Sequence, residues 1–240
     1  MAKVNGLGVR LYAAGYDLSG DVNVVDSIGY TQTLLDVTTL DKAATARIAG
    51  LSDSSLTVSG WFEAASDHAA YTSNSGKLPT ADQIVFTQMG TDLGDTFAGL
   101  SAKEATYVVA RAPGSALATT ATYSGTAGEQ AEWGVTLTAS KTTNASAASG
   151  TGVDNAASSA NGCVAYLEAM SLVSGTCVVK VQHSANNSTW ADLITFTSVT
   201  TANVPFAERA TASGTINRYL RINTSGTFST IVFVAGVARL

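Results

Sequence analysis

The sequence predicts a mainly β fold: a β-sandwich or barrel with one short helix and a long loop, followed by a second β-sandwich-like region. Alternating apolar and polar residues recur in short runs, as in Leu56–Glu63 and Trp133–Ala139, and this alternation is typical of half-buried strands. Turn-forming residues such as Ser174-Gly175 and Ser225-Gly226 separate the runs, as expected for strands joined by tight turns. With 240 residues, 45% of them hydrophobic, the chain is long enough for one large β domain or two smaller ones.

The first half is predicted to contain strands and one helix. The expected strands are Val9–Tyr12, Val22–Val25, Leu56–Glu63, Gln83–Thr87, Phe97–Leu100, Thr106–Arg111 and Trp133–Ala139. In the last of them, the odd-numbered side chains from Trp133 to Ala139 should share one buried face. Ala64–Asn74 suits about two helical turns, because Ser66 is a good N-cap and Pro79 follows the segment.

The stretch Asp26–Asp53 has no regular pattern and is predicted to be a long loop. Structureless loops of more than about 12–15 residues are uncommon in compact domains and are usually functional or disordered. This one is too apolar for a disordered linker, since it contains Ile28, Tyr30, Leu34, Leu35, Val37, Leu40, Ile48 and Leu51. A long apolar loop that its own domain cannot bury should be buried in a neighbouring molecule. We therefore expect this loop to mediate assembly.

A change of composition marks a domain boundary. Lys141–Ala160 consists almost entirely of Ala, Ser, Thr, Gly and Asn, which predicts a linker or an exposed loop. We therefore expect one domain over residues 1–145 and a second over residues 146–240. The second should contain strands only, at Cys163–Val173, Cys177–His183, Trp190–Thr197, Pro205–Ala212, Arg218–Asn223 and Phe228–Ala238. The last strand is apolar on both faces and should be central or covered by a partner.

The two cysteines, Cys163 and Cys177, are predicted to be buried free thiols. The strands that contain them are expected to form a hairpin turning at Ser174-Gly175, and in that register the thiols do not lie opposite each other. Metal binding is not expected, because the chain has only two histidines and neither has the spacing of a ligand pair. No cofactor is expected.

The charge distribution argues against nucleic-acid binding. Only 13% of the residues are charged, about half of the usual 25%, which indicates a surface largely covered by other subunits. Residues 1–145 carry 8 basic and 14 acidic side chains, and residues 146–240 carry 5 and 4. No basic cluster occurs that would bind phosphates. The first ten residues do not read as a signal peptide, and no apolar run approaches about 18 residues, so we expect a soluble protein without a signal peptide or membrane insertion.

No catalytic site is expected. A Ser-His-Asp triad needs a histidine that faces its partners, and each histidine has only sequence-adjacent candidates. Two pairs of carboxylates, Asp92 with Asp95 and Glu129 with Glu132, have the setting of solvated turn residues rather than of a glycosidase site. No Gly-Lys-Ser/Thr sequence indicates a phosphate-binding loop.

Trp190 is a candidate binding residue. It follows an Asn-rich turn, and it is either a stacking platform for a carbohydrate or a core residue beside Ile194 and Phe196.

Four charged residues are candidates for contacts between subunits. Arg218 and Arg221 should lie on the polar face of one strand. That face is either solvated or pairs with acidic residues of another copy, such as Asp92 and Asp95.

The order of these features resembles the major tail tube proteins of long-tailed bacteriophages. The resemblance is carried by the initial strand pair, by LDVTTLDKAATARIAGLSDSSLTVSGWFE (residues 35–63) and by the short Ala-rich helix that follows. It covers residues 1–140 best, while AYLEAMSLVSGTCVVKVQHSANNSTWADLITF (residues 165–196) is similar to the C-terminal part of such tail proteins. The second β region is a departure, because simple tube proteins have one sandwich.

The resemblance implies a structural virion protein without enzyme activity that closes with its copies into rings and stacks them into a tail tube. The long loop would reach into the next ring. Rings would contain six copies, or three if both halves form the wall. Further implied partners are tape-measure, tail-terminator and tail-tip proteins, with assembly of the virion tail in the bacterial cytoplasm. Genomic DNA would pass through an acidic lumen without specific binding. The alternative is a carbohydrate-binding or decoration module of a virion or cell surface, carried by the second half.

Overall fold

The computed structural model describes residues 8–62, 82–111, 113–126 and 129–240. Within these ranges the chain forms strands and no helix, which confirms the mainly β prediction. The helix predicted at residues 64–74 lies outside the described residues. In chain order the strands are β1 (Val9–Ala13), β2 (Tyr16–Asp17), β3 (Val22–Asp36), β4 (Arg47–Trp61), β5 (Asp82–Met89), β6 (Thr96–Ala110), β7 (Ala118–Gly125), β8 (Glu132–Thr136), β9 (Thr142–Asn144), β10 (Ala148–Ser149), β11 (Val153–Asp154), β12 (Cys163–Ser184), β13 (Ala191–Thr195), β14 (Val199–Thr200), β15 (Phe206–Ala212) and β16 (Tyr219–Arg239).

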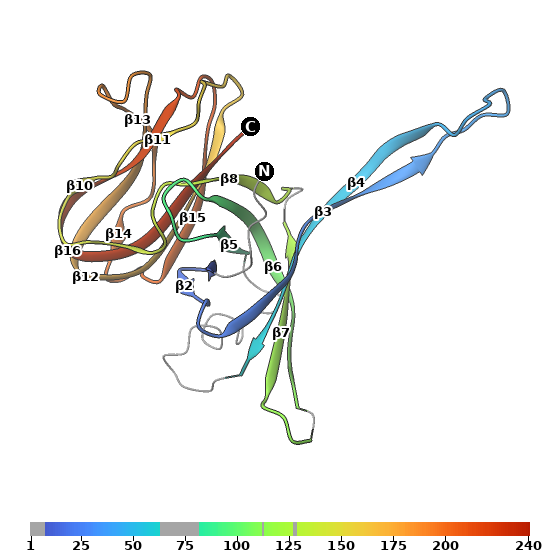
Figure 1. Cartoon of the computed structure of the whole chain (residues 1–240), viewed down its shortest axis with the longest axis horizontal. Helices are drawn as coiled ribbons and strands as arrows, with labels where there is room; N and C mark the ends of the chain where they lie inside the picture. Colours follow the sequence, from blue (N-terminus) through green and yellow to red (C-terminus); the bar gives the residue numbers. More distant parts are fainter. Residues whose placement is uncertain (1–7, 63–81, 112, 127–128) are drawn as a thin grey trace.

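All the strands described belong to one hydrogen-bonded antiparallel sheet (Figure 1). In the first half, β6 is central: its beginning pairs with β5 and β8, and its end pairs with β7. β5 continues to β1 and β2, while β7 continues to β4 and β3. β8 joins this half to β16 of the second half. The division at about residue 145 stays a prediction.

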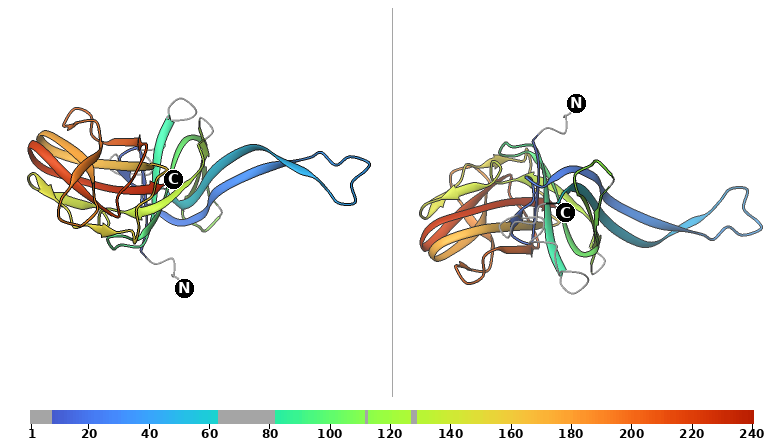
Figure 2. Two further views of the ribbon diagram at one scale, coloured as in Figure 1. Left: turned by 90° about the horizontal axis from the view of Figure 1, so that it is seen from above. Right: turned by 90° about the horizontal axis from the view of Figure 1, so that it is seen from below.

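The predicted long loop Asp26–Asp53 is wrong, because most of it is a β-hairpin. β3 and β4 pair from Val22 opposite Gly60 to Asp36 opposite Arg47, leaving only residues 37–46 as a turn. Three register shifts interrupt this pairing. Each bulge changes which side chains share a face, so the alternation that identifies a strand is lost from the sequence. The hairpin projects away from the body in every view (Figures 1 and 2).

The second half is built on two long strands, β12 and β16, which pair along almost their whole length. The predicted turns at Ser174-Gly175 and Ser225-Gly226 are wrong, because both glycines lie inside these strands. Gly175 and Gly226 have φ of +85° and +108°, a region that glycine adopts without strain. A Cβ at Gly175 would lie 2.2 Å from the Thr227 carbonyl oxygen. At these glycines the backbone is locally distorted and the two strands approach each other closely. The pairing of β12 with β16 continues through both positions.

The predicted linker Lys141–Ala160 is also wrong. Its short strands β9, β10 and β11 pair with β16, and Ser159 forms an isolated bridge with Ile216. The segment is therefore held by backbone hydrogen bonds while most of its side chains are exposed. This combination explains why its composition resembles that of a linker.

Among the described residues, three apolar clusters form the core. One fills the second half, with Phe196, Ile231 and Phe233 among its members, and one fills the first half around Leu56 and Leu100.

The third cluster joins the halves, combining Tyr12, Phe86 and Phe97 with Tyr166 and Val234. The Phe86 and Phe97 rings stack at 4.5 Å, and Tyr166 meets Phe97 edge-on at 5.7 Å. The C-terminal part of β16 is buried on both faces from Phe233 to Ala238, and β16 lies inside the sheet between β12 and β8, in line with the prediction that the last strand is central or covered by a partner.

The predicted buried face of Trp133–Ala139 is wrong. Trp133 is 47% exposed, whereas Thr136 is buried. Strand β8 ends at Thr136, so Leu137 and Ala139 do not continue its alternation.

The free, buried cysteines are confirmed, although the hairpin from which they were inferred does not exist.

Candidate assembly surface

The β3–β4 hairpin concentrates exposed apolar side chains at its distal end. Seven of the eight residues predicted from the sequence are exposed there: Tyr30, Leu34, Leu35, Val37, Leu40, Ile48 and Leu51. The most accessible are Leu40 and Leu51, which are 109% and 88% exposed. Ile28 differs, because it is half-buried against the core of the first half.

Both faces of the hairpin carry apolar residues. Leu35 lies opposite Ile48, and the preceding pair is Leu34 with Ala49. Successive residues of a strand point to opposite faces, so the two pairs face in opposite directions. Beside the first pair, a shallow hollow is lined by Thr33, Leu35, Ala49, Gly50 and Leu51. The distal hairpin therefore offers an apolar surface on each side.

The hairpin edges are open as well. β4 pairs with β7 only from Ser55 onward, and among the described residues no strand pairs with the outer edge of β3. A two-stranded hairpin alone in water is only marginally stable, and open strand edges are sites for pairing with another chain.

Side-chain hydrogen bonds organise the turn at the tip. Asp36 Oδ1 accepts hydrogen bonds from the amide (2.8 Å) and hydroxyl (2.6 Å) of Thr38. The Ala46 amide donates in turn to Thr38 Oγ1 at 2.8 Å. These bonds from Thr38 lower the pKa of Asp36. The turn presents Leu40 at its apex.

Three of the four charged residues predicted to join subunits, Asp95, Arg218 and Arg221, use their side chains for bonds inside the chain. Arg218 binds Asp154, with Nε–Oδ1 and Nη2–Oδ2 distances of 2.6 and 2.5 Å. This contact lowers the pKa of Asp154 to about 2. Asp95 accepts a hydrogen bond of 2.8 Å from the Asp92 amide. The sequence did not indicate Asp154, because it lies in the segment interpreted as a linker.

Trp190 lies at the surface, half-buried, just before β13. The Arg221 guanidinium lies over its ring, 4.2 Å from the centroid, and Arg221 Nε donates to Gln182 at 2.9 Å. Ile194 and Phe196 belong to the core of the second half, whereas Trp190 is only half-buried and is not part of that cluster. The interpretation of Trp190 as a core residue beside them is therefore wrong. One ring face is already covered by Arg221. The carbohydrate-binding interpretation stays a prediction.

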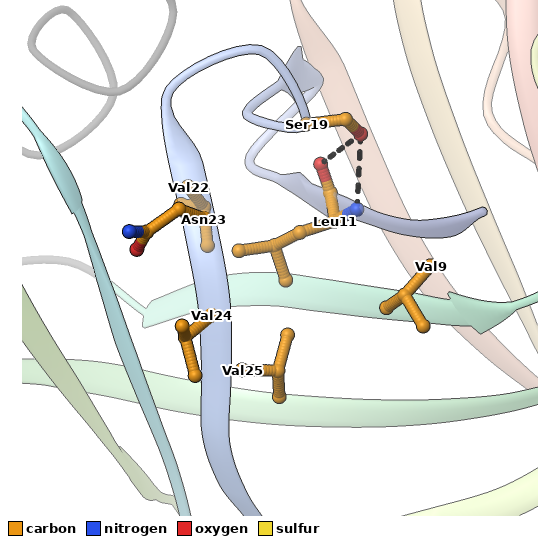
Figure 3. A pocket seen from close by; sticks show the side chains of 7 residues that line it. All are labelled: Val9, Leu11, Ser19, Val22, Asn23, Val24 and Val25. Carbon is orange, nitrogen blue, oxygen red and sulfur yellow. Dashed lines mark hydrogen bonds between the residues drawn. The ribbon is translucent and has the colours of Figure 1, made fainter. Parts of the chain in front are cut away.

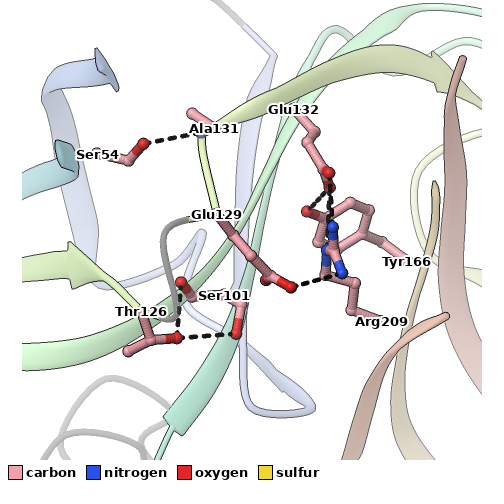
Figure 4. A network of polar contacts seen from close by, with 8 residues as sticks. All are labelled: Ser54, Ser101, Thr126, Glu129, Ala131, Glu132, Tyr166 and Arg209. Atoms are coloured by element: carbon pink, nitrogen blue, oxygen red, sulfur yellow. Dashed lines mark hydrogen bonds and ion pairs between the residues drawn. The ribbon is translucent and has the colours of Figure 1, made fainter. Parts of the chain in front are cut away.

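A polar cluster joins the two halves (Figure 4). Arg209 of β15 binds Glu132 through Nη2–Oε1 and Nε–Oε2 distances of 2.7 and 3.1 Å, and its Nη1 lies 2.8 Å from Glu129 Oε1. The Tyr166 hydroxyl also donates to Glu132. Burial and then the Glu132 carboxylate raise the pKa of Tyr166. The prediction that Glu129 and Glu132 are solvated turn residues is therefore wrong: they hold β15 against the first half.

A single buried carboxyl lies elsewhere at the same junction. Glu168 of β12 is fully buried, and its Oε2 accepts a hydrogen bond of 2.5 Å from the Gly15 amide. Its Oε1 has no hydrogen-bond partner among the described residues. Burial raises the pKa of Glu168 well above its ordinary value.

No constellation of catalytic type is found in the described part of the chain. His183 Nδ1 accepts a hydrogen bond from the Asn217 amide at 3.3 Å, and burial followed by the charge of Arg239 lowers its pKa. No group of three or more metal-binding side chains occurs among the described residues. Over the same residues, no helix is long and apolar enough to cross a membrane.

No family model and no curated protein matches the sequence. Solved structures give distant similarities. The Dit (gp 19.1) protein of SPP1, described as a hub of the adsorption apparatus in phages infecting Gram-positive bacteria, has a TM-score of 0.39 and 12% identity over 96% of this chain and 99% of its own. A chain from the tail of an empty gene transfer agent (GTA) particle has a TM-score of 0.39 and 13% identity, and the match covers 52% of this chain and 94% of the GTA chain. A chain of the phage p2 baseplate has a TM-score of 0.33 and 8% identity, and the match covers 97% of this chain and 98% of the baseplate chain. At these scores and identities the similarities do not establish a family.

Proposed function

We propose that the chain is a structural subunit of a bacteriophage tail that polymerises into stacked rings and forms a tail tube, a conduit for genome delivery. It performs no catalysis. The observation that supports this function is the projecting β3–β4 hairpin, with apolar side chains on both faces and open edges. Such a ribbon gains stability when another molecule covers it.

Contiguous exposed apolar surface is rare on monomeric proteins and marks sites of association. Seven such side chains lie on the projecting hairpin, so a copy displaced along the hairpin can cover them without rearranging the body. The low charged fraction of 13% suits a subunit whose surface is mostly in contact with its copies.

The proposal includes the composition of the tail. Each ring would contain six copies, or three if both halves line the wall, and the tube would contact tape-measure, tail-terminator and tail-tip proteins. DNA would pass without specific binding, because residues 1–145 carry more acidic than basic side chains. Asp92 and Asp95 remain proposed contacts between subunits. Arg218 and Arg221 would join such contacts only in addition to their internal bonds.

The test is a double substitution on the hairpin, Leu35→Asp with Leu40→Asp, examined by electron microscopy of the purified protein. Both side chains are exposed, so the monomer should keep its melting temperature while tube growth stops. The matched control is Val173→Asp on β12, which also replaces an exposed apolar side chain (66% exposed) but lies outside the hairpin. Long tubes formed by the double variant would contradict the proposed role of the hairpin.

A further inference from the structure

A pocket lies at the foot of the hairpin, where β1 and β3 approach each other without pairing (Figure 3). Its volume is about 270 Å³, just below the 300 Å³ at which pockets begin to suit drug-sized ligands. The lining residues are Val9, Leu11, Ser19, Val22, Asn23, Val24 and Val25. We call this the valine pocket. Five of the seven lining residues are aliphatic, and an apolar cavity of about 150 Å³ already holds a benzene molecule, so the pocket has room for an apolar side chain.

Beside the valine pocket, the backbone amide and carbonyl of Leu11 already have hydrogen-bond partners. The Leu11 carbonyl accepts a hydrogen bond from the Leu18 amide at 2.9 Å, and the Leu11 amide donates to Ser19 Oγ at 3.1 Å. Buried polar groups need hydrogen-bond partners, and these are already supplied from within the chain. An apolar side chain can therefore enter without leaving the Leu11 amide or carbonyl unpaired.

The same chain presents a matching apolar side chain at the other end of the hairpin. Leu40 is completely exposed at the apex of the turn, and the bonds among Asp36, Thr38 and Ala46 hold the turn in one shape. A side chain on a pre-ordered turn loses little further freedom on binding. Because the tip and the foot lie at opposite ends of the ribbon (Figure 1), Leu40 cannot reach the valine pocket of its own chain.

We propose that Leu40 of one copy inserts into the valine pocket of the next copy along the tube. This inference rests on the proposed tube function and identifies the receptor for the hairpin. In this contact the tip of one copy binds the foot of another, so two different surfaces of identical chains meet. Repeated along one direction, such a contact adds copies without closing a ring and produces an open stack. Leu40, the proposed occupant, is a fully exposed side chain of this same chain, so the partner is a second copy.

The contact also predicts a repeat distance. From Val25 at the pocket to Asp36 at the start of the turn, β3 advances eleven residues, which is about 37 Å at a strand rise of about 3.4 Å per residue. The turn adds a few ångströms. If the hairpin runs along the tube axis, successive rings should be spaced by about 40 Å.

Disulfide trapping tests the contact, using a chain with both Leu40→Cys and Val24→Cys. Val24 is 45% exposed, so the substitution does not disturb the core. The native thiols are buried, which raises the pKa of each to about 11 and keeps them from competing. Mild oxidation of assembled protein should give a ladder of covalent oligomers on non-reducing gels. A control chain that combines Leu40→Cys with Val173→Cys should give none.

A charge exchange provides the second arm. Leu40→Asp or Val24→Lys alone should each block assembly, and a chain with both should assemble again because the new charges face each other. Leu40→Ala should raise the critical concentration for assembly about tenfold, as expected for one lost buried aliphatic side chain. Tubes that form without the covalent ladder and without rescue by the charge pair would overturn the Leu40 contact and leave the tube function intact. A wild-type chain that never self-associates would overturn both.

Discussion

Glu168 provides a quantitative test of the junction between the two halves. It is fully buried, with one hydrogen bond from the Gly15 amide and no partner for its second oxygen among the described residues. Burial raises the pKa of this carboxyl well above the ordinary glutamate value of 4.5. Between the ordinary pKa and the raised pKa, the folded chain therefore keeps a proton that the unfolded chain has released.

The sign of the effect follows from proton linkage. In this pH window the folded state binds one more proton than the unfolded state, so the free energy of unfolding falls as pH rises. For one group the slope is about 1.4 kcal/mol per pH unit. Glu168→Gln keeps the shape and an acceptor for Gly15 but cannot ionise. The stability of the variant relative to wild type should increase by about 1.4 kcal/mol for each pH unit above 5, until the folded pKa is reached.

Urea unfolding of both proteins at half-unit steps from pH 5 to pH 8 measures this difference. Subtracting the two curves removes the contributions of the other titrating groups. Glu208→Gln is the control, because Glu208 is only partly buried and accepts hydrogen bonds from Thr197. A stability difference for Glu168→Gln that stays constant over the whole range would refute the idea that Glu168 is held protonated.

Three further outcomes are expected. Arg209→Met should lower the free energy of unfolding by about 3 kcal/mol, because it leaves two partly buried glutamates without their cation; a loss below about 1 kcal/mol in chemical unfolding would contradict the role of this cluster. Replacing residues 33–51 with Asn-Gly should change the monomer's stability by less than about 0.5 kcal/mol while abolishing assembly, and a large fall in melting temperature would show that the distal hairpin supports the body. Cys163 and Cys177 should resist alkylation at pH 8 in the folded protein, since burial raises the pKa of each to about 11; labelling as fast as in urea would contradict this.

The sequence predicted those strands whose side chains alternate between the core and solvent or whose two faces are both buried. β5 and β15 were found within two residues of their ends. The end of β16 was predicted to be central or covered by a partner, because apolar residues such as Ile231, Phe233 and Val234 point to both faces of the strand. In these segments, local pattern and burial agree.

The β3–β4 hairpin could not be recognised as strands for two physical reasons. Its bulges shift the alternation, and its distal part has no buried face within the chain, so apolar residues such as Leu34 and Leu35 occur side by side. The sequence therefore identified a set of apolar residues that are exposed in this chain without identifying their secondary structure.

The junction was invisible for a different reason. Arg209 and Glu132 are 77 positions apart, and Glu168 and Gly15 are 153 apart. Neither pair has a local signature, because their proximity depends on how the two halves pack. Gly175 and Gly226 were misinterpreted similarly, since a glycine within a long paired strand has the same local sequence context as a turn.

Electron microscopy of the purified wild-type chain over a range of concentrations tests the tube function most directly. We predict hollow tubes with three-fold or six-fold rings spaced by about 40 Å, in which each β3–β4 hairpin bridges to the next ring. Single particles of monomer size at every concentration, or tubes whose hairpins touch no other copy, would contradict it.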